Sequence, residues 1–181
     1  MTTREALLRR RGTAAGGRTF LIRPTSLDDA GALVALRDSI AAEGDLIAAV
    51  PGERSAIEES LALAGILSQG GLSLTLEVGG DVAGHLMARR LHGGLDTGTA
   101  EIAIAVHNTA RGLGLGRILM ETAIDWSRAV RLRTLQLCVF PSNLRAIALY
   151  RSLGFIDQSP SPQRVELAVG PRELLLMELT L

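Results

Sequence analysis

Apolar and polar residues alternate in several segments of the chain, which is the pattern of β-strands with one buried face. Between residues 72 and 78, leucine or valine alternates with serine, threonine and glutamate. Gly79 and Gly80 follow and can adopt a positive φ at little steric cost, so we expect a hairpin there and a longer glycine-rich turn over 93–99. The predicted strands are 20–23, 72–78, 82–89, 101–106, 134–139 and 174–179.

Two capping boxes predict the starts of helices, one formed by Ser26 with Asp29 and one by Ser55 with Glu58. Apolar residues recur at helical spacing behind each box. The expected buried stripes are Leu33, Leu36 and Ile40 in the first helix and Ile57, Leu61 and Ala64 in the second. Two further helices are predicted, one from about 116 to 130 and one over 143–152. The buried face of the longer one should comprise Leu119, Ala123, Trp126 and Val130.

The order of these elements predicts an α+β fold, with a mixed, mostly antiparallel sheet flanked by helices. Three successive strands lack intervening helices, which argues against a doubly wound sheet. With 181 residues, 47% of them hydrophobic, the chain can bury one core, so we expect a single domain over 19–181. Residues 1–18 carry five arginines and are expected to form a flexible basic extension; a presequence or an arm for an acidic partner is the alternative.

Composition excludes several kinds of chemistry. All 19 basic residues are arginines, so a Walker phosphate loop and a pyridoxal Schiff base are ruled out. The 19 acidic residues balance them, and the five aromatic residues are scattered, which argues against a nucleic-acid partner. One cysteine, Cys138, forms no internal disulfide and suggests a reducing, cytoplasmic location. We expect no membrane span and, from the spacing of histidines and acids, no metal.

A glycine-rich loop between a strand and a helix carries the most specific signal. It reads Arg111-Gly112-Leu113-Gly114-Leu115-Gly116 and leads into the helix at Arg117. Unpaired amides and the helix dipole at such a position favour an anion, and a diphosphate is the natural ligand; a tight turn without a ligand is the alternative. Arginine at position 117 excludes the dinucleotide-binding fingerprint, which needs glycine there. Arg111 and Arg117 could add positive charge.

Three spaced motifs together resemble the GNAT superfamily of N-acetyltransferases. They are Arg111-x-x-Gly114-x-Gly116, Leu135-x-Leu137-x-Val139 and Asn143-x-x-Ala146-x-x-x-Tyr150-x-x-x-Gly154-Phe155. The resemblance covers roughly 20–181, and the specific motifs lie between 101 and 155. Segments 42–45 and 51–53 are similar to the ribosomal-protein and small-amine branches, although that part is generic. The implied fold is that of the GNAT acyl-CoA N-acyltransferases.

The resemblance implies acetyl-CoA as the donor and direct transfer of its acetyl group to a primary amine in a ternary complex. In the family, the strand equivalent to 101–106 diverges from the one equivalent to 134–139, and the pantetheine arm fills the gap. The implied cofactor-binding residues are Ile104, Val106, Arg111, Gly112, Leu113, Gly114, Leu115, Gly116, Arg117 and Asn143. Asn143 could contact the arm or only start its helix.

The resemblance places the hydroxyl of Tyr150, the only tyrosine, near the thioester sulfur, where it could protonate the departing thiolate; packing on a helix face is the alternative. Glu101 is the candidate base, because it shares a face of its strand with Ala103 and Ala105. A bulge would turn its side chain the other way. His107 and His85 are weaker candidates for the base, because each is more often a surface or turn histidine. Cys138 is interpreted as a core residue and not as a nucleophile.

The acceptor is left open among a protein N-terminus, a lysine side chain, a polyamine, an amino-acid analogue and an aminoglycoside. Acidic residues at Glu43, Asp45 and Glu53 could attract a cationic amine or belong to a solvated loop. Two other functions stay open: a GNAT-like module that binds acetyl-CoA or CoA without turnover, and a site for another nucleotide. Dimers are common among similar proteins, so a homodimer is also considered.

Overall fold

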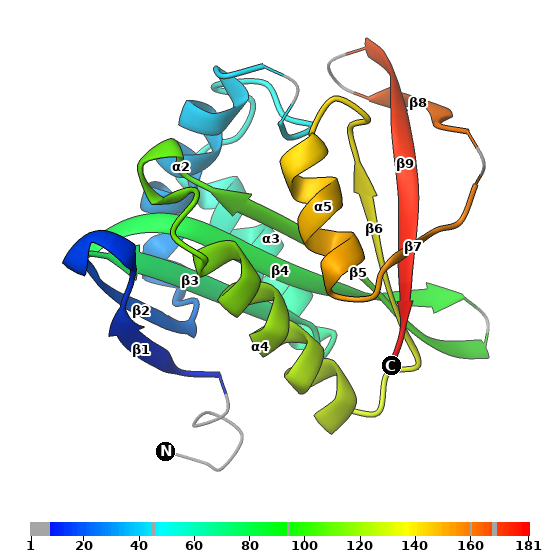
Figure 1. The fold of residues 1–181 in the computed structure, drawn as a ribbon, viewed down its shortest axis with the longest axis horizontal. Helices are drawn as coiled ribbons and strands as arrows, with labels where there is room; N and C mark the ends of the chain where they lie inside the picture. Colours follow the sequence, from blue (N-terminus) through cyan, green and yellow to red (C-terminus); the bar gives the residue numbers. More distant parts are fainter. Residues whose placement is uncertain (1–7, 45, 94, 160, 168–169) are drawn as a thin grey trace.

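A computed structural model describes residues 8–181 except 45, 94, 160 and 168–169 (Figure 1). The strands form one nine-stranded sheet in the order β1-β2-β3-β4-β5-β6-β9-β7, with β8 paired to β9. All these pairings are antiparallel except β5 with β6. The strands are β1 Arg10–Thr13, β2 Thr19–Pro24, β3 Leu72–Val78, β4 Asp81–Gly93, β5 Leu95–Val106, β6 Thr134–Val139, β7 Ile156–Asp157, β8 Gln163–Leu167 and β9 Gly170–Thr180. The predicted α+β class with a mixed, mostly antiparallel sheet is confirmed.

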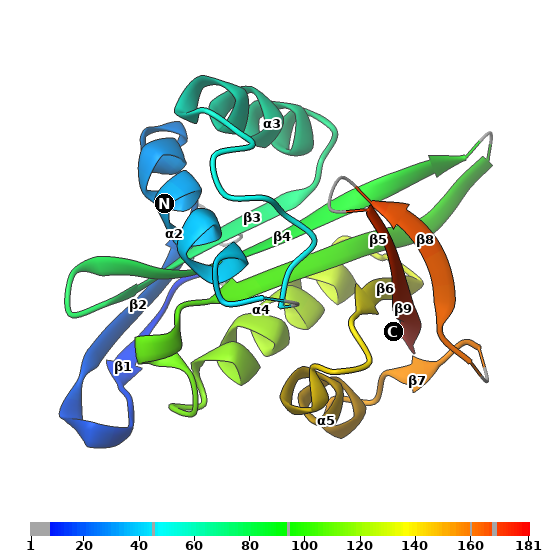
Figure 2. The same ribbon diagram turned by 90° about the horizontal axis from the view of Figure 1, so that it is seen from above.

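Helices cover both faces of the sheet. They are α2 Ala30–Ala41, α3 Ala56–Ser68, α4 Leu115–Ala129 and α5 Leu144–Ser152, with short 3-10 turns η1 Ala15–Gly17, η2 Leu27–Asp29 and η3 Asn108–Ala110. Figure 2 shows α2 and α3 on one face and α4 and α5 on the other. None of these helices is long and apolar enough to cross a bilayer.

The local signals read from the sequence set the helix boundaries. Both capping boxes form, because the backbone N–H of Ser26 donates to Asp29 at 2.8 Å and that of Ser55 donates to Glu58 at 2.7 Å. The predicted face of α2 is buried, and so are Leu119, Ala123 and Trp126 of the face predicted for α4. Val130, the fourth predicted residue, is half-buried just after α4 ends. Gly154 ends α5 with a φ of 93°, as expected.

The buried face predicted for α3 is wrong. Ile57 is 75% exposed and Leu61 is 68% exposed, whereas Leu63 and Glu59 are buried. Positions 57 and 59 lie about 200° apart around a helix, so the true face is nearly opposite to the predicted one. Apolar residues surround most of α3, so their spacing does not mark one face, and Glu59 is buried because it pairs with Arg54 at 2.9 Å.

Several strands extend beyond the predicted ones. Residues 10–13, inside the expected flexible extension, form β1 and pair with β2, while residues 1–7 lie outside the described part of the chain. The expected long turn over 93–99 is mostly strand, since β4 continues to Gly93 and β5 starts at Leu95. β7 and β8 are additional, and β9 starts before the predicted residue 174.

Candidate active site

The two central strands β5 and β6 are paired over only three residue pairs. Thr99, Ala100 and Glu101 face Thr134, Leu135 and Gln136, and the pairing then stops while both strands continue. On its other edge β5 stays paired with β4 as far as Val106. The C-terminal half of β5 therefore has one edge without a strand partner in the described structure.

The hydrogen-bond pattern shows which main-chain groups lie on that edge. The N–H of His107 donates to the carbonyl of Ala83 at 2.9 Å, so the odd-numbered residues of β5 exchange hydrogen bonds with β4. The polar main-chain groups of Ile104 and Val106 consequently point away from β4. These are the two residues that the resemblance assigns to the pantetheine arm. The carbonyl of Val106 already accepts a bond from Arg111 Nε at 2.8 Å.

The side chains of β5 divide between the two faces of the sheet. Ile102 is buried on the α4 face, whereas Ala103 is exposed on the α2 and α3 face and Ala105 packs against the small apolar cluster beneath those helices. The pairing of β4 and β5 shows no register shift along this stretch, so no bulge turns Glu101 away from the alanine face. An acceptor could therefore approach through the exposed part of this face, beside Ala103.

The glycine loop presents a run of free amides at the start of α4. Gly112 and Gly114 have φ values of 75° and 79°, and Gly114 is the N-cap of α4. No main-chain N–H from Gly112 to Gly116 donates to another group of the described chain. A Cβ at Gly112 or Gly114 would meet no atom within 4 Å, so the glycines leave open space beside the amides. This arrangement is suited to an anion with several oxygens.

The two arginines that flank the loop are engaged by other groups. Arg111 holds the carboxylate of Glu43 through two bonds of 2.6 and 2.9 Å, in addition to its bond to Val106. Arg111 also lowers the pKa of Glu43 through that hydrogen bond. Arg117 donates to Ser152 on α5 at 2.6 Å and lies 3.6 Å from Glu121. The loop amides, unlike these two arginines, are therefore free to hold an anion without first releasing a partner in the described chain.

Leu113 and Leu115 contribute only their backbone groups to the surface of the glycine loop, because their side chains pack on the core. The side chain of Leu115 is 1% exposed, and that of Leu113 packs against the main core. Both side chains anchor the loop on the sheet, which fixes the direction of the neighbouring amides.

Tyr150 lies on α5, on the opposite side of the sheet from α2 and α3. Its side chain is 7% exposed, and its ring packs against Phe155 at a centroid distance of 6.0 Å. Burial raises the pKa of the Tyr150 hydroxyl to about 12, so the phenol is protonated at neutral pH. It makes no hydrogen bond to another described residue, which leaves its proton available to a ligand. Packing and proton donation are both compatible with this position.

Asn143 caps α5. Its side-chain oxygen accepts a bond from the N–H of Ala146 at 3.3 Å, which is the helix-starting role considered from the sequence. This bond leaves the NH₂ group of the Asn143 side chain free to donate.

Glu101 has a partner that sequence analysis missed. Arg89 on β4 lies directly opposite it and donates to its carboxylate at 2.5 Å. The pair would have to open before Glu101 took a proton, which weakens its case as a base. Pairs of opposite charge across neighbouring strands are a recognisable signal once strand register is known.

The interpretation of Cys138 as a core residue is wrong, because its side chain is exposed. Cys138 lies two residues beyond Gln136, on the same face of the sheet as Glu101. Partial burial and the nearby charge of Glu101 raise the pKa of its thiol. The thiol is therefore kept in its protonated, weakly nucleophilic form.

The interpretation of His85 as a surface or turn residue is also wrong. It lies within β4, half-buried, with Nε2 2.8 Å from Ser73 Oγ. Desolvation lowers the pKa of His85 to about 4, although Glu59 and Asp29 act in the opposite direction. The imidazole is therefore neutral at physiological pH.

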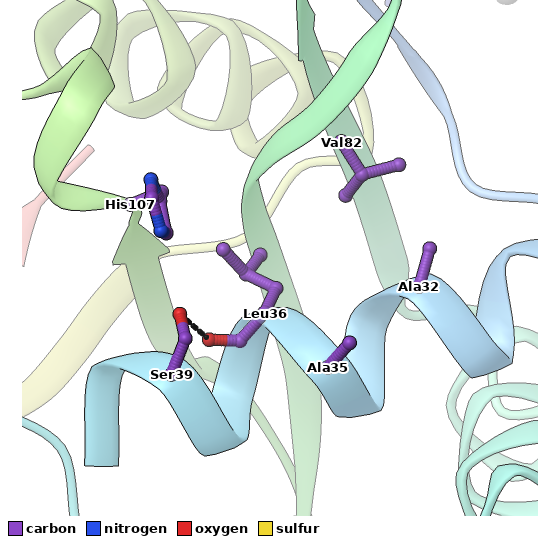
Figure 3. Close-up of a pocket in the computed structure, with 6 residues that line it drawn as sticks. All are labelled: Ala32, Ala35, Leu36, Ser39, Val82 and His107. Carbon is purple, nitrogen blue, oxygen red and sulfur yellow. Dashed lines mark hydrogen bonds between the residues drawn. The ribbon is translucent and has the colours of Figure 1, made fainter. Parts of the chain in front are cut away.

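His107 does lie in a turn, just after β5, where Nδ1 is 2.9 Å from Thr109 Oγ1. It also lines a pocket of about 300 Å³ beside α2, shown in Figure 3. The other lining residues are Ala32, Ala35, Leu36, Ser39 and Val82. A second hollow of about 300 Å³ lies between α3 and β4, where Met87 and Arg89 line it.

The acidic residues proposed to attract an amine are only partly described. Glu43 is neutralised by Arg111, and Glu53 accepts a bond from the N–H of Val50 at 3.1 Å. Asp45 lies outside the described residues. Among those residues, no group of three or more histidine, cysteine, aspartate or glutamate side chains is arranged to hold a metal ion.

Comparison with known proteins identifies the family of the chain. A model of the acetyltransferase (GNAT) family matches residues 40–155. The chain belongs to this family.

The chain is also similar to individual acetyltransferases. The chain is 40% identical over 76 residues, 42% of its length, to a [ribosomal protein bS18]-alanine N-acetyltransferase of Salmonella typhimurium, and that match spans about half, 51%, of the relative. A ribosomal-protein-alanine N-acetyltransferase from Brucella melitensis has a TM-score of 0.79 at 25% identity, covering 88% of this chain and 99% of the other. The fold also matches yncA from Salmonella typhimurium, solved with its cofactor acetyl-CoA, at a TM-score of 0.78 and 24% identity over 89% and 93% of the two chains.

Proposed function

We propose that this GNAT protein is an N-acetyltransferase that moves the acetyl group of acetyl-CoA directly to a primary amine. The observation that carries the proposal is the run of free amides from Gly112 to Gly116 beside the unpaired edge of β5. A diphosphate satisfies the amides, and an extended amide-containing arm satisfies the strand edge. Acetyl-CoA contains both groups in one molecule, and a protein of the same fold has been solved with it.

The proposed site separates the donor's two ends. The diphosphate lies at the start of α4, and the arm runs along the free edge of β5, where the N–H groups of Ile104 and Val106 are available. An N–H at this edge would polarise the thioester carbonyl and stabilise the charge that develops on its oxygen.

The chemical step needs an acid for the sulfur. Tyr150 is protonated, and its hydroxyl has no partner in the described chain. As the amine nitrogen bonds to the acetyl carbon and the carbon–sulfur bond breaks, the phenol donates its proton to the thiolate. No covalent acetyl-enzyme is required, and the exposed thiol of Cys138, whose pKa is raised, is not suited to form one.

The acceptor amine approaches beside Ala103, on the face opposite Tyr150. A protein N-terminal amine is the first acceptor to test, because two of the relatives are ribosomal-protein-alanine acetyltransferases. Small primary amines remain in the test set. The ion pair of Glu43 with Arg111 has no net charge, so it does not select a cationic polymer as acceptor.

The proposal is tested with purified protein, acetyl-CoA and a panel of amine acceptors that includes peptides beginning with alanine. We expect acetyl-CoA to raise the melting temperature and mass spectrometry to find acetylated product. At 100 times its Kd the ligand should stabilise the fold by about 2.7 kcal/mol. Stabilisation by acetyl-CoA without product from any amine would favour a binding module, and no stabilisation would overturn the donor site itself.

A further inference from the structure

A chain of hydroxyl groups links His85 to Asp29 across the face of the sheet beneath α2 and α3. His85 Nε2 lies 2.8 Å from Ser73 Oγ, which lies 2.8 Å from Thr25 Oγ1. Thr25 Oγ1 is 3.0 Å from Thr75 Oγ1, and Thr75 Oγ1 is 3.2 Å from Asp29 Oδ2. All three hydroxyl-bearing residues are buried. The sequence does not reveal this series of hydroxyl groups, because serine and threonine that alternate with leucine in β3 are expected to face water.

The acidic end of the chain is held as a carboxylate. Arg23 binds Asp29 through two bonds of 2.7 and 2.8 Å, and the N–H of Ser26 adds a third at 2.8 Å. Arg23 lowers the pKa of Asp29. A carboxylate only accepts hydrogen bonds, so the proton in its contact with Thr75 must come from the threonine.

The carboxylate of Asp29 determines which group donates in every other hydrogen bond of the series, because each hydroxyl has only one proton. Thr75 uses its proton on Asp29, so the contact between Thr75 and Thr25 uses the proton of Thr25. Thr25 must then accept from Ser73, and Ser73 must accept from His85. The imidazole therefore carries its proton on Nε2, and Nδ1 keeps a free lone pair.

The free nitrogen belongs to the acceptor side of the proposed site. His85 lies directly opposite Ala105 in the register of β4 and β5, so both side chains share the α2 and α3 face with Glu101 and Ala103. Nδ1 makes no hydrogen bond to another described residue, and it is not among the buried polar atoms that lack a partner, so it is not sealed from solvent.

The carboxylates near the His85 ring are each paired with an arginine. Glu59 on α3 and Asp29 on η2 both favour a proton on the imidazole, but the first is paired with Arg54 and the second with Arg23. On β3, Ser73 and Thr75 contribute hydroxyls beside the ring, and Glu77 on the same face is paired with Arg23 at 2.7 Å. Ala105 on β5 is apolar. Desolvation outweighs the two carboxylates, so the ring is neutral and able to accept a proton.

We propose that Nδ1 of His85 accepts the proton of the acceptor amine during acetyl transfer, and that the hydroxyl chain to Asp29 holds the ring in the tautomer that makes this possible. This inference rests on the proposed acetyltransferase function. The amine lone pair forms the C–N bond, the C–S bond breaks, Tyr150 protonates sulfur, and the surplus proton on nitrogen goes to Nδ1. A weak base is sufficient because that nitrogen becomes strongly acidic once it is bonded to the acetyl carbon.

The tautomer is tested without any acceptor. Nitrogen-15 NMR of the histidine-labelled protein, with the His85→Gln variant to assign the signal, should show neutral His85 protonated on Nε2 at pH 7. The Thr75→Val variant removes the donor to Asp29 and should release the constraint, giving a mixture of tautomers. A wild-type ring protonated on Nδ1 would overturn the proposal.

The catalytic role is tested by chemical rescue. We expect His85→Ala to lower kcat at least about 100-fold, within the range of general acid–base catalysis, with the Kd for acetyl-CoA nearly unchanged. Added imidazole should restore part of the rate in His85→Ala and none in Tyr150→Phe, the matched control. Undiminished activity of folded His85→Ala, or a loss that imidazole does not restore, would overturn the assignment. If the wild-type protein acetylates no amine, the proposed function fails instead.

Discussion

The guanidinium of Arg111 joins the carboxylate of Glu43, 68 residues earlier in the chain, to the carbonyl of Val106 at the end of β5. This one side chain thus ties the segment after α2 to the strand that precedes the glycine loop. It also means that the charge nearest to the loop is balanced by a carboxylate before any ligand binds.

Two substitutions at this pair should have opposite effects on donor binding. Glu43→Gln leaves an unbalanced guanidinium beside the amides and should tighten acetyl-CoA binding severalfold at low salt, with a stability loss of no more than about 1 kcal/mol. Arg111→Ala should weaken binding. Titration calorimetry at two salt concentrations measures both, and equal weakening in the two variants would contradict this account.

Gly114→Ala should reduce acetyl-CoA affinity at least about tenfold while the protein stays folded. The added methyl group meets no protein atom, so the fold loses only about 1 kcal/mol for a residue at a φ of 79°. The methyl group would occupy space that the phosphates need. Gly79→Ala, at a φ of 66° in the β3–β4 hairpin with the same open surroundings, is the control for backbone strain. Matching losses of affinity in both variants would remove Gly114 from the site.

Tyr150→Phe should lower kcat about 10²- to 10⁴-fold and leave the Kd for acetyl-CoA nearly unchanged. Because burial raises the pKa of the hydroxyl to about 12, its ionisation should cause no loss of rate below about pH 10. Steady-state rates across pH, together with direct binding measurements, check both points. An unchanged kcat would assign Tyr150 to packing alone.

The folded protein should lose stability as the pH falls from about 6.5 to 4, because the pKa of His85 is about 4 when folded and near 6.5 when unfolded. A depressed pKa means that the unfolded chain binds the proton more tightly, so the stabilisation is complete above 6.5 and is lost toward 4. The size is up to about 3 kcal/mol at roughly 1.4 kcal/mol per pKa unit. Urea unfolding at several pH values should show this slope in the wild type, and a flatter one in His85→Gln. The same slope in both would place its origin elsewhere.

Cys138→Ala should retain kcat within about threefold, because the proposed transfer is direct and the raised pKa keeps the thiol protonated. The protein is mixed with acetyl-CoA, the reaction is quenched rapidly, and intact-protein mass spectrometry should then find no acetyl group on Cys138. Accumulation of an acetylated Cys138 at a rate matching turnover would replace the direct mechanism with a two-step one.

Much of the fold could be predicted from the sequence because its signals are local. The capping boxes, the β3–β4 hairpin and the buried faces of α2 and α4 each depend on residues within a few positions of one another. The order of these elements was enough to indicate the α+β class. The buried face predicted for α3 is wrong because the apolar residues of this helix do not lie on one side.

The candidate site was less predictable because its key contacts join distant segments. The partners Arg111 and Glu43, Arg89 and Glu101, and Thr25 and Ser73 meet only once the strands have paired. No periodicity marks such pairs. Burial of His85 and exposure of Cys138 likewise depend on which helix covers each strand, which local spacing does not reveal.

The three-pair contact between β5 and β6 divides the sheet into two blocks with few main-chain bonds between them. An extended ligand bound between the diverging ends of β5 and β6 would bond to main-chain groups like an added strand and so connect the two blocks. Cooperativity of unfolding should then depend on whether the ligand is bound. Without it, the block β6 to β9 should unfold separately from the rest of the sheet, whereas the liganded protein should unfold as a unit.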